Sequence, residues 1–437
     1  MHILIAGGGI GGLALALSLH QAGIDCEVFE QVPEIRPLGV GINVLPHAMR
    51  ELTELGLQDR VAAAGIVTQE LAYANRFGQM IWSEPRGRLA GYTWPQVSIH
   101  RGHLHLALLA AARERLGDAR IRLGARMAGF EQDEAGVTLR LDDGRAPRGD
   151  LLVAADGIHS AARAIFYPNE GVPIWNGAIL WRATSIADPF LTGATMAVAG
   201  NRNDKFVVYP IRDLPDGRKL TNWIAERRLD PDQDWKREDW NRPGRIEDFE
   251  QTFAGWRFPW LDIPALIRSA EAVYEFPMVD RDPLPRWTHG RVTLLGDAAH
   301  PLYPIGSNGA SQAILDARTL ALKLATMEDA AAALGAYEAI RRPATAALLK
   351  ATRGDGPDAV LDMAEQRAPQ GFDDIEAVMP QAERAGIAAY YKQLAGFEPA
   401  TLNARPSLSP PRAAAGVPGQ ALRAAARSRG PAPPARG

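Results

Sequence analysis

The hydrophobic pattern at the start of the chain predicts a strand, a helix and a second strand. Residues 2–6 (HILIA) form a short aliphatic and β-branched run, which is typical of a fully buried parallel strand. Residues 13–23 (LALALSLHQAG) place apolar side chains at helical spacing and end at Gly23, a common helix stop. Residues 26–30 (CEVFE) indicate a second strand. A right-handed βαβ crossover is the simplest fold for such a unit.

Two kinds of pattern follow along the chain. Helical spacing returns at 104–116, and the aliphatic runs 151–155 and 291–296 indicate further buried parallel strands, the last followed by an alanine-rich helix from about 308 to 326. Residues 173–280 instead alternate apolar and polar positions, as the strands of a half-exposed antiparallel sheet do.

These patterns predict an α/β protein in which a Rossmann-like dinucleotide-binding domain is interleaved with a mainly antiparallel β-sheet domain, followed by C-terminal helices. The dinucleotide-binding domain is expected at residues 1–69, 98–172 and 286–345, the sheet domain at 70–97 and 173–285, and the helical region at 346–400. Residues 401–437 contain seven prolines, six arginines and no acidic residue, so we expect a disordered tail there.

Composition narrows the classes of function. Hydrophobic residues make up 46% of the 437 residues and charged residues 23%, an ordinary balance for a soluble protein with a large core. The net charge of -3 provides no overall basic field, so neither nucleic acid nor a membrane is an expected partner. A single cysteine, Cys26, excludes an intramolecular disulfide and a cysteine-built metal site. Without a signal leader or a spanning apolar run, a cytoplasmic location is expected.

A glycine cluster lies between the first predicted strand and the first predicted helix. Gly7, Gly9 and Gly12 form G-x-G-x-x-G, in which the glycines permit a tight turn, close approach of a pyrophosphate, and packing of helix on strand. Phosphates would then lie at the positive end of the helix dipole. Glu30 ends the second strand, where a carboxylate can accept both ribose hydroxyls of an adenosine. The combination indicates FAD or NAD, and Glu30 disfavours the 2′-phosphate of NADP at this position.

Two later motifs favour FAD over NAD, because they resemble motifs of a known flavoprotein family. Residues 151–163 (LLVAADGIHSAAR) resemble the Asp-Gly motif of flavoprotein aromatic hydroxylases, and residues 294–317 (LLGDAAHPLYPIGSNGASQAILDA) resemble their Gly-Asp motif. The family is the class A FAD-dependent monooxygenases of the para-hydroxybenzoate hydroxylase type. Further stretches, including 276–285 (FPMVDRDPLP), resemble its phenazine hydroxylase branch, which acts on 5-methylphenazine-1-carboxylate. The family often has glycine where this chain has Ala154.

The resemblance and the glycine motif together imply a set of FAD contacts. In the family, the carboxylate matching Asp297 bonds the ribityl chain, and the helix after Gly306 aims its N-terminus at the part of the flavin that gains negative charge on reduction. The residues expected to bind FAD are Gly7, Gly9, Ile10, Gly11, Gly12, Glu30, Gln31, Arg36, Arg101, Asp156, Gly157, Arg163, Gly296, Asp297, Pro304, Gly306, Ser307, Asn308, Gly309 and Ala310.

The reaction that the resemblance implies is hydroxylation of an aromatic or heteroaromatic acid, phenazine-like or salicylate-like, by a monomer or homodimer. NADPH or NADH would bind transiently as electron donor, and O2 would react with reduced flavin to give a C4a-hydroperoxide in a dry pocket. Pro304, in a loop expected beside the flavin, and Tyr209 and Arg182, on sheet strands, are the expected catalytic residues. Trp181, Arg182, Tyr209 and Pro304 are the expected substrate contacts, with sheet core or surface as the plainer alternative for those on strands.

Two other functions fit the same motifs. An FAD-dependent dehydrogenase or oxidase would be reduced by its substrate without NAD(P)H, and a non-catalytic flavoprotein would need to have lost the cofactor motifs, which are intact. No metal site is expected: His100, His103 and His105 are closely spaced, but on a helix only the first two share a face.

Overall fold

The computed structural model describes residues 1–37, 40–229, 243–354 and 356–410, and it confirms the predicted α/β fold. Its first sheet has the strand order β20-β21-β12-β1-β2-β8, and all pairs are parallel except β20 with β21. The strands are β20 (Thr288–His289), β21 (Val292–Leu294), β12 (Leu151–Ala154), β1 (His2–Ala6), β2 (Asp25–Glu30) and β8 (Ile121–Leu123). Helix α1 (Ile10–Gln21) connects β1 to β2, as the βαβ pattern predicts.

The second sheet has seven strands in the order β19-β13-β16-β15-β14-β5-β6. They are β19 (Val273–Asp280), β13 (Ile174–Ala187), β16 (Lys219–Arg228), β15 (Asp204–Asp213), β14 (Thr195–Gly200), β5 (Glu70–Ala74) and β6 (Met80–Pro85). Only β14 and β5 pair in parallel, so the sheet is mainly antiparallel as expected. An aromatic core covers one face, where Phe206, Trp223 and Phe253 pack with helices α6 (Glu250–Phe253) and α7 (Ile263–Arg268).

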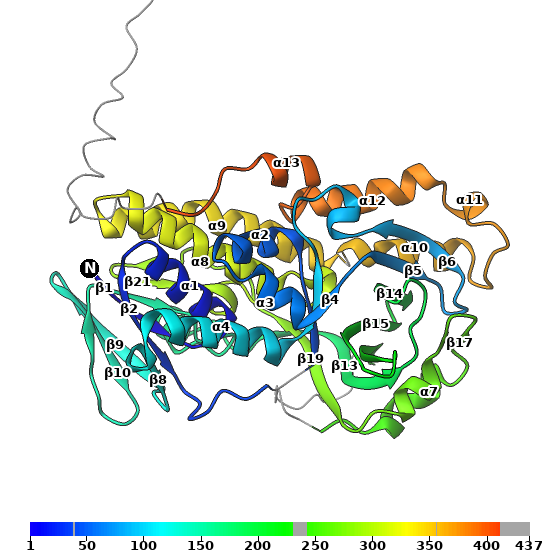
Figure 1. The fold of residues 1–437 in the computed structure, drawn as a ribbon, viewed down its shortest axis with the longest axis horizontal. Helices are drawn as coiled ribbons and strands as arrows, with labels where there is room; N and C mark the ends of the chain where they lie inside the picture. The colour runs from blue at the N-terminus through cyan, green and yellow to red at the C-terminus, as the bar shows by residue number, and fades with distance from the viewer. Residues whose placement is uncertain (38–39, 230–242, 355, 411–437) are drawn as a thin grey trace, which may run out of the picture.

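Two three-stranded sheets and one two-stranded sheet contain the remaining strands. One joins β3 (Gly41–Val44), β7 (Val97–His100) and β4 (Gly65–Val67), and the other joins β9 (Met127–Asp133), β10 (Gly136–Leu141) and β11 (Arg148–Gly149). A further pair joins β17 (Arg257–Phe258) and β18 (Leu261–Asp262). The two large sheets are side by side in Figure 1. Strands β4 and β7 contact β15 of the second sheet, and Gly41 of β3 donates to Asn222 of β16 (2.7 Å).

Helices pack on the first sheet and along one side of the molecule (Figure 1). The longest are α4 (Arg101–Leu116), α8 (Gly309–Thr326) and α9 (Ala330–Arg353), and shorter ones are α2 (Pro46–Glu54), α3 (Gln58–Ala63) and α5 (Ala161–Phe166). The C-terminal region adds α10 (Ala359–Arg367), α11 (Ile375–Val378), α12 (Gln381–Leu394) and α13 (Pro399–Ala404). Helix α9 runs through the domain boundary expected at residue 345, so the helical region is continuous with the dinucleotide-binding part.

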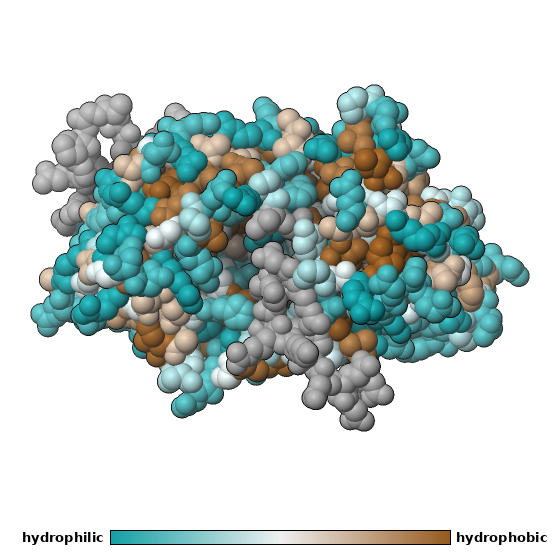
Figure 2. Space-filling model, turned by 90° about the horizontal axis from the view of Figure 1, so that it is seen from below, coloured by the Kyte–Doolittle hydropathy of each residue, from teal (hydrophilic) through white to brown (hydrophobic). Residues whose placement is uncertain are grey.

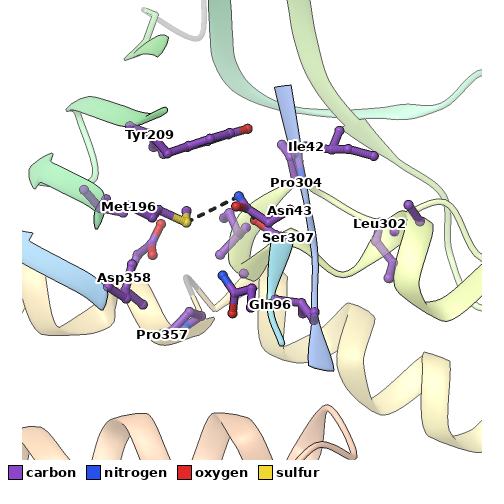
Figure 3. A pocket seen from close by; sticks show the side chains of 18 of the residues that line it. Ile42, Asn43, Gln96, Met196, Tyr209, Leu302, Pro304, Ser307, Pro357 and Asp358 are labelled. Atoms are coloured by element: carbon purple, nitrogen blue, oxygen red, sulfur yellow. Dashed lines mark hydrogen bonds between the residues drawn. The ribbon is translucent and has the colours of Figure 1, made fainter. Parts of the chain in front are cut away.

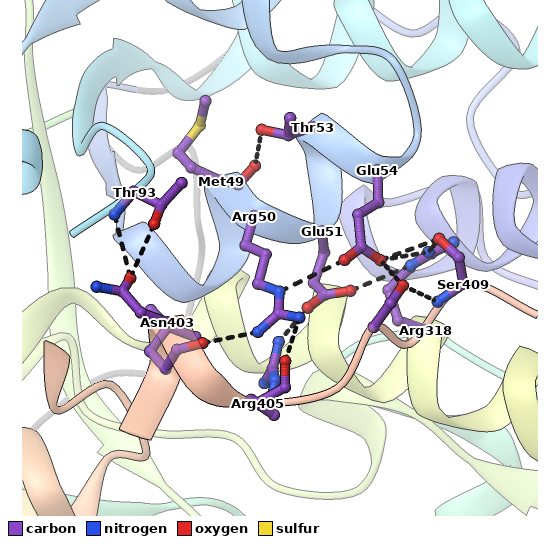
Figure 4. A network of polar contacts seen from close by, with 12 residues as sticks. Met49, Arg50, Glu51, Thr53, Glu54, Thr93, Arg318, Asn403, Arg405 and Ser409 are labelled. Carbon is purple, nitrogen blue, oxygen red and sulfur yellow. Dashed lines mark hydrogen bonds and ion pairs between the residues drawn. The ribbon is translucent and has the colours of Figure 1, made fainter. Parts of the chain in front are cut away.

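The expectation of a disordered tail from residue 401 is wrong for residues 401–410, whereas 411–437 lie outside the described residues. Buried charges hold this segment against α2 (Figure 4). Arg50 donates to the carbonyls of Leu402 (2.7 Å) and Arg405 (2.5 Å). Glu51 forms ion pairs with the fully buried Arg318 and with Arg405. Composition alone could not reveal these partners, since they lie far away in sequence.

Hydrophilic residues cover most of the face drawn in Figure 2, and hydrophobic residues gather there in separate patches. In the part of the chain that the structure describes, no helix is both long enough and apolar enough to cross a membrane.

We predict that replacing Glu51 with alanine destabilises the protein by about 3 kcal/mol, because the buried Arg318 would keep only Glu54 as a carboxylate partner and Arg405 would lose its ion pair with Glu51. Urea-induced unfolding measures the change. The matched control is Glu114→Ala, which breaks an exposed ion pair with Arg60 and should cost less than about 1 kcal/mol. Equal losses for the two variants would show that the Glu51 network does not stabilise the C-terminal segment.

Candidate active site

Residues far apart in sequence meet at one edge of the first sheet. Strands β21, β12, β1 and β2 are adjacent and parallel, so the residues that follow them lie next to one another. Asp297 follows β21, Asp156 follows β12, Gly7 follows β1, and Glu30 ends β2. The carboxyl edge of a parallel α/β sheet is where such folds bind their ligands.

Two glycines at this edge pack so closely on neighbouring backbone that no side chain would fit, whereas a third faces open space. Gly7 has φ +108°, and a Cβ atom there would lie 2.2 Å from the carbonyl oxygen of Ala155. A Cβ atom at Gly12 would lie 1.9 Å from the carbonyl oxygen of Gly7. At Gly9, in contrast, an added Cβ would meet no protein atom within 4 Å. The open space at Gly9 fits the glycine-rich cradle that a pyrophosphate requires.

Acidic groups organise the loops of the edge. Glu30 accepts the N–H groups of Gly8 (2.7 Å) and Val32 (3.0 Å), which fixes its carboxylate beside the glycine turn. His105 contacts the other side of that turn, with Nε2 2.6 Å from the carbonyl oxygen of Gly8. Asp156 accepts the N–H of Ala161 (2.8 Å), while its other oxygen is buried without a protein partner and burial raises the pKa of Asp156.

The Gly-Asp loop is held from behind by Asp316. Its carboxylate accepts the N–H of Gly296 (3.1 Å), lies 2.5 Å from Nε2 of His300 and pairs with Arg341 (2.7 Å). Burial alone would raise the pKa of Asp316, but the charges of His300 and Arg341 outweigh it and lower the pKa to about 2. Asp316 therefore remains ionised and anchors the loop.

Asp297 faces the cavity in front of this loop. Its side chain is exposed to the cavity space, yet protein surrounds it closely enough that desolvation raises the pKa of Asp297, while His300 and Arg101 act in the opposite direction. The neighbouring loop keeps an unusual backbone, with φ +72° at Gly306 and +59° at Ser307. A Cβ atom at Gly306 would lie 2.0 Å from the hydroxyl of Tyr391, so only glycine fits there.

A single cavity of about 380 Å³ extends from these loops to the second sheet. Figure 3 shows Tyr209, Met196 and Asp358 across from Asn43, Ser307 and Gln96. The predicted residues that line the cavity are Gly9, Ile10, Gly11, Arg101, Gly157, Arg182, Tyr209, Gly296, Asp297, Pro304, Gly306, Ser307, Gly309 and Ala310. The residues Gly9–Gly11, Gly306, Ser307, Gly309 and Ala310 and the side chain of Asp297 line one cavity that fits FAD. The predicted contact Asn308 is buried behind this lining, where its amide donates to Gly306 and Tyr391.

On the second sheet, one row of cross-strand neighbours lines the cavity over six consecutive strands. The row runs Arg182, Ile224, Val207, Val198, Tyr73 and Trp82, on β13, β16, β15, β14, β5 and β6. Five spacings of about 4.8 Å make this row roughly 24 Å long. Its middle is aliphatic and its ends are aromatic or charged.

Arg182 ends the row on β13, and Tyr209 of β15, which is not part of the row, lies beside it. Arg182 donates to the carbonyl of Gly41 (2.9 Å) and hydrogen-bonds the Tyr209 side chain. Desolvation lowers the pKa of Arg182 and raises the pKa of Tyr209 to about 12, although the arginine opposes the latter shift. Tyr209 is therefore a neutral hydroxyl at physiological pH.

The prediction that Trp181 contacts the substrate is wrong, because this residue does not line the cavity. Its indole stacks on Phe249 (ring centroids 4.9 Å apart) in the aromatic core, on the face of the sheet away from the cavity. Adjacent strand residues point to opposite faces, so Trp181 and Arg182 cannot both face the cavity.

Other predicted FAD contacts lie outside the cavity lining. Arg163 is buried behind it, where it pairs with Glu170 and donates to the carbonyls of Ala298 and Ala299 (3.1 Å each). It therefore supports the Gly-Asp loop. Gln31 and Arg36 are exposed beyond β2, and Arg36 pairs with Glu34 (2.6 Å), so their contacts with FAD stay a prediction.

Sequence reasoning missed much of the far side of the cavity. Asn43 accepts the hydroxyl of Ser98 (2.6 Å) and donates to Ser307 (3.3 Å), which ties β3 to the flavin-facing loop. The C-terminal helices were expected only as a helical region, but Asp358, Arg384, Tyr391 and Lys392 line the cavity from them. No motif marks these positions in the sequence. Helical periodicity could have identified the apolar Ile387 and Ala388 between them as facing inward.

Comparisons with known proteins agree with this geometry. The chain matches the FAD binding domain family over residues 1–238 and 263–352. It is 47% identical to the phenazine 1,6-dicarboxylic acid hydroxylase of Lysobacter antibioticus, covering 80% of this chain and 89% of that protein. It is 36% identical to the aurachin C monooxygenase/isomerase of Stigmatella aurantiaca, over 78% and 85% of the two chains.

Among solved structures, the Klebsiella pneumoniae HpxO complex with FAD and uric acid matches with a TM-score of 0.70 and 26% identity, covering 90% of this chain and 92% of that one. The resemblance to the phenazine hydroxylase branch is thereby confirmed. The chain belongs to the FAD-dependent aromatic monooxygenases that share this FAD binding domain.

Proposed function

We propose that the enzyme hydroxylates an aromatic or heteroaromatic acid with NADPH or NADH and O2. A phenazine-like acid is the first candidate substrate, and a salicylate-like acid is the second. One oxygen atom forms the new carbon–oxygen bond, the other leaves as water, and two electrons come from NAD(P)H. Bound FAD would supply the redox chemistry that carries those electrons to oxygen. The naming of the Lysobacter relative for a phenazine diacid supports the order of the two substrate classes.

Arg182 carries the proposal of an acidic substrate. It is a guanidinium in the cavity wall for which, among the described residues, no carboxylate lies within ion-pair distance. A cation removed from water is costly unless an anion pairs with it, so a ligand carboxylate or phenolate would complete the site. Tyr209, held protonated beside it, would donate a second hydrogen bond.

Pro304 would shape the reacting end. It lies in the cavity lining directly before the flavin-facing turn Ile305–Ser307, and its ring presents no N–H to the cavity. An apolar surface at this point would exclude water from the reacting atoms. Asp297 and Arg101 would contact FAD near its flavin ring. Glu30, at the end of β2, would accept the ribose hydroxyls at the adenosine end of the cofactor.

Substitutions at Gly9 and Gly12 should have different effects, the first on FAD binding and the second on the stability of the fold. Gly9→Ala adds a methyl group where no protein atom lies within 4 Å, so the apoprotein should keep its thermal unfolding midpoint while FAD binds at least tenfold more weakly. Gly12→Ala forces a backbone shift and should lower the midpoint even without FAD. Calorimetry of FAD binding and thermal scans of the apoproteins check both. Normal FAD affinity in Gly9→Ala would contradict the assigned pyrophosphate site.

Arg182→Met should raise KM for an aromatic acid by about 10- to 100-fold, the worth of a hydrogen bond to a charged group. The matched control, Arg212→Met on β15, removes an exposed arginine and should leave KM within about twofold. Steady-state kinetics with NAD(P)H provides the measurement. If both variants keep the parent KM, Arg182 does not bind the acid group.

The decisive experiment for the function uses ¹⁸O2. NAD(P)H consumption by the FAD-loaded enzyme is followed across a panel of phenazine and single-ring aromatic acids, and the products are analysed by mass. We expect one ¹⁸O atom per product molecule. Flavin reduction by substrate without NAD(P)H, with no label in any product, would instead indicate a dehydrogenase or oxidase.

A further inference from the structure

The flavin-facing turn Ile305–Ser307 is held from behind by side chains to which the proposed reaction gives no role. Gly306 and Ser307 both have left-handed backbone, with φ +72° and +59°. For a residue other than glycine this conformation is costly, so it persists only where the surroundings fix it. The contacts that fix the turn come from Asn308 and, across the cavity wall, from Tyr391 of α12.

Tyr391 packs directly against the turn. Its hydroxyl accepts the side-chain N–H of Asn308 (2.8 Å) and donates to the carbonyl of Ile305 (3.4 Å). A hydroxyl can accept one hydrogen bond while it donates another, so the two contacts form together. Burial raises the pKa of Tyr391, and the side chain therefore stays neutral and keeps its proton to donate. Helix α12 follows residue 352, where the match to the FAD binding domain family ends.

The same contact is one end of a buried hydrogen-bond chain. The side-chain oxygen of Asn308 accepts from Gln312 (3.2 Å), and Gln312 accepts from Arg341 (2.5 Å). Arg341 pairs with Asp316, whose carboxylate holds the Gly-Asp loop. Asn308, Gln312 and Asp316 are at most 3% exposed, so water does not replace these bonds. The chain from Tyr391 therefore ties the turn to the Gly-Asp loop.

The engagement of Asn308 leaves the start of α8 uncapped. Asn308 is the N-cap residue of this helix, a position where asparagine commonly accepts N–H groups of the first turn. Here its side chain makes no capping bond and is held by Gly306 and Tyr391 instead. Gly309 and Ala310, in the first turn, line the cavity. The positive end of the helix dipole is therefore available to a negative charge in the cavity.

We propose that Tyr391 is a positioning residue for the reduced cofactor, because its hydroxyl fixes Asn308 and the turn so that the first turn of α8 faces the flavin. Reduction adds negative charge to the flavin ring, whereas the charge of the pyrophosphate does not change. Loss of the hydroxyl would therefore weaken the binding of reduced FAD more than that of oxidised FAD. The inference rests on FAD binding in the cavity and not on the identity of the substrate.

The test measures the reduction potential of FAD bound to the enzyme, by equilibration with a reference dye and without NAD(P)H or an aromatic acid. Tyr391→Phe keeps the buried ring and removes only the hydroxyl. We expect reduced FAD to lose about tenfold in affinity relative to oxidised FAD, which lowers the potential of a two-electron couple by about 30 mV. The matched control is Tyr390→Phe, because Tyr390 lies on the same helix with 67% of its side chain exposed, and it should keep the parent potential.

A double variant tests the route through Asn308. Asn308→Ala should lower the potential by itself, and the addition of Tyr391→Phe should lower it no further, because both changes remove the same hydrogen bond. Falls that add would overturn the inference, since the two side chains would then act independently. An unchanged potential in Tyr391→Phe would also overturn it, and a lower unfolding midpoint of that apoprotein would then assign the hydroxyl a structural role alone.

The result is separate from that of the hydroxylation experiment. A potential that falls in Tyr391→Phe, in an enzyme that incorporates no ¹⁸O into any product, would overturn the proposed function and leave the role of Tyr391 standing. Incorporation of the label together with an unchanged potential would overturn the role of Tyr391 and support the proposed function.

Discussion

The cavity exists because the backbones of Gly7, Gly12 and Ala155 pack against one another where β1, α1 and β12 meet. A single methyl group at Gly12 would lie 1.9 Å from a carbonyl oxygen, so this contact admits no side chain. It brings the ends of four parallel strands to one edge and aligns the Gly-Asp loop with the glycine turn. Everything that the enzyme does with FAD and substrate follows from that alignment, since the loop in turn faces the second sheet.

The half of the site that contacts FAD could be predicted from the sequence because its chemistry depends on backbone shape. Glycine positions, a strand-terminal carboxylate and the Asp-Gly and Gly-Asp motifs report directly on turns that only certain residues can form. The described structure brings these residues together, and Asp316 shows how a motif residue acts from behind the loop. Arg163 is a similar case, since its guanidinium supports the loop and does not line the cavity.

The half that would contact substrate could be predicted only in part. From Trp181 to Ile186 buried and less buried residues alternate along β13, so the period of two places Trp181 and Arg182 on opposite faces. The alternation does not say which of the two faces borders the cavity, and only the packed structure shows that it is the face of Arg182. Arg86 directly follows β6, whereas Asp358 and Lys392 belong to the C-terminal region, and only tertiary packing brings them to one cavity. Residues 401–410 are a similar case, because the partners that order them lie on α2 and α8.

The most direct test is a diffraction structure of crystals grown with FAD and an aromatic acid. We expect adenosine density within hydrogen-bonding distance of Glu30, the isoalloxazine ring against Pro304 to Gly309, and the acid group of the ligand beside Arg182 and Tyr209. Density for FAD away from Glu30 and Asp297, or an acid group bound away from Arg182, would contradict the assigned site.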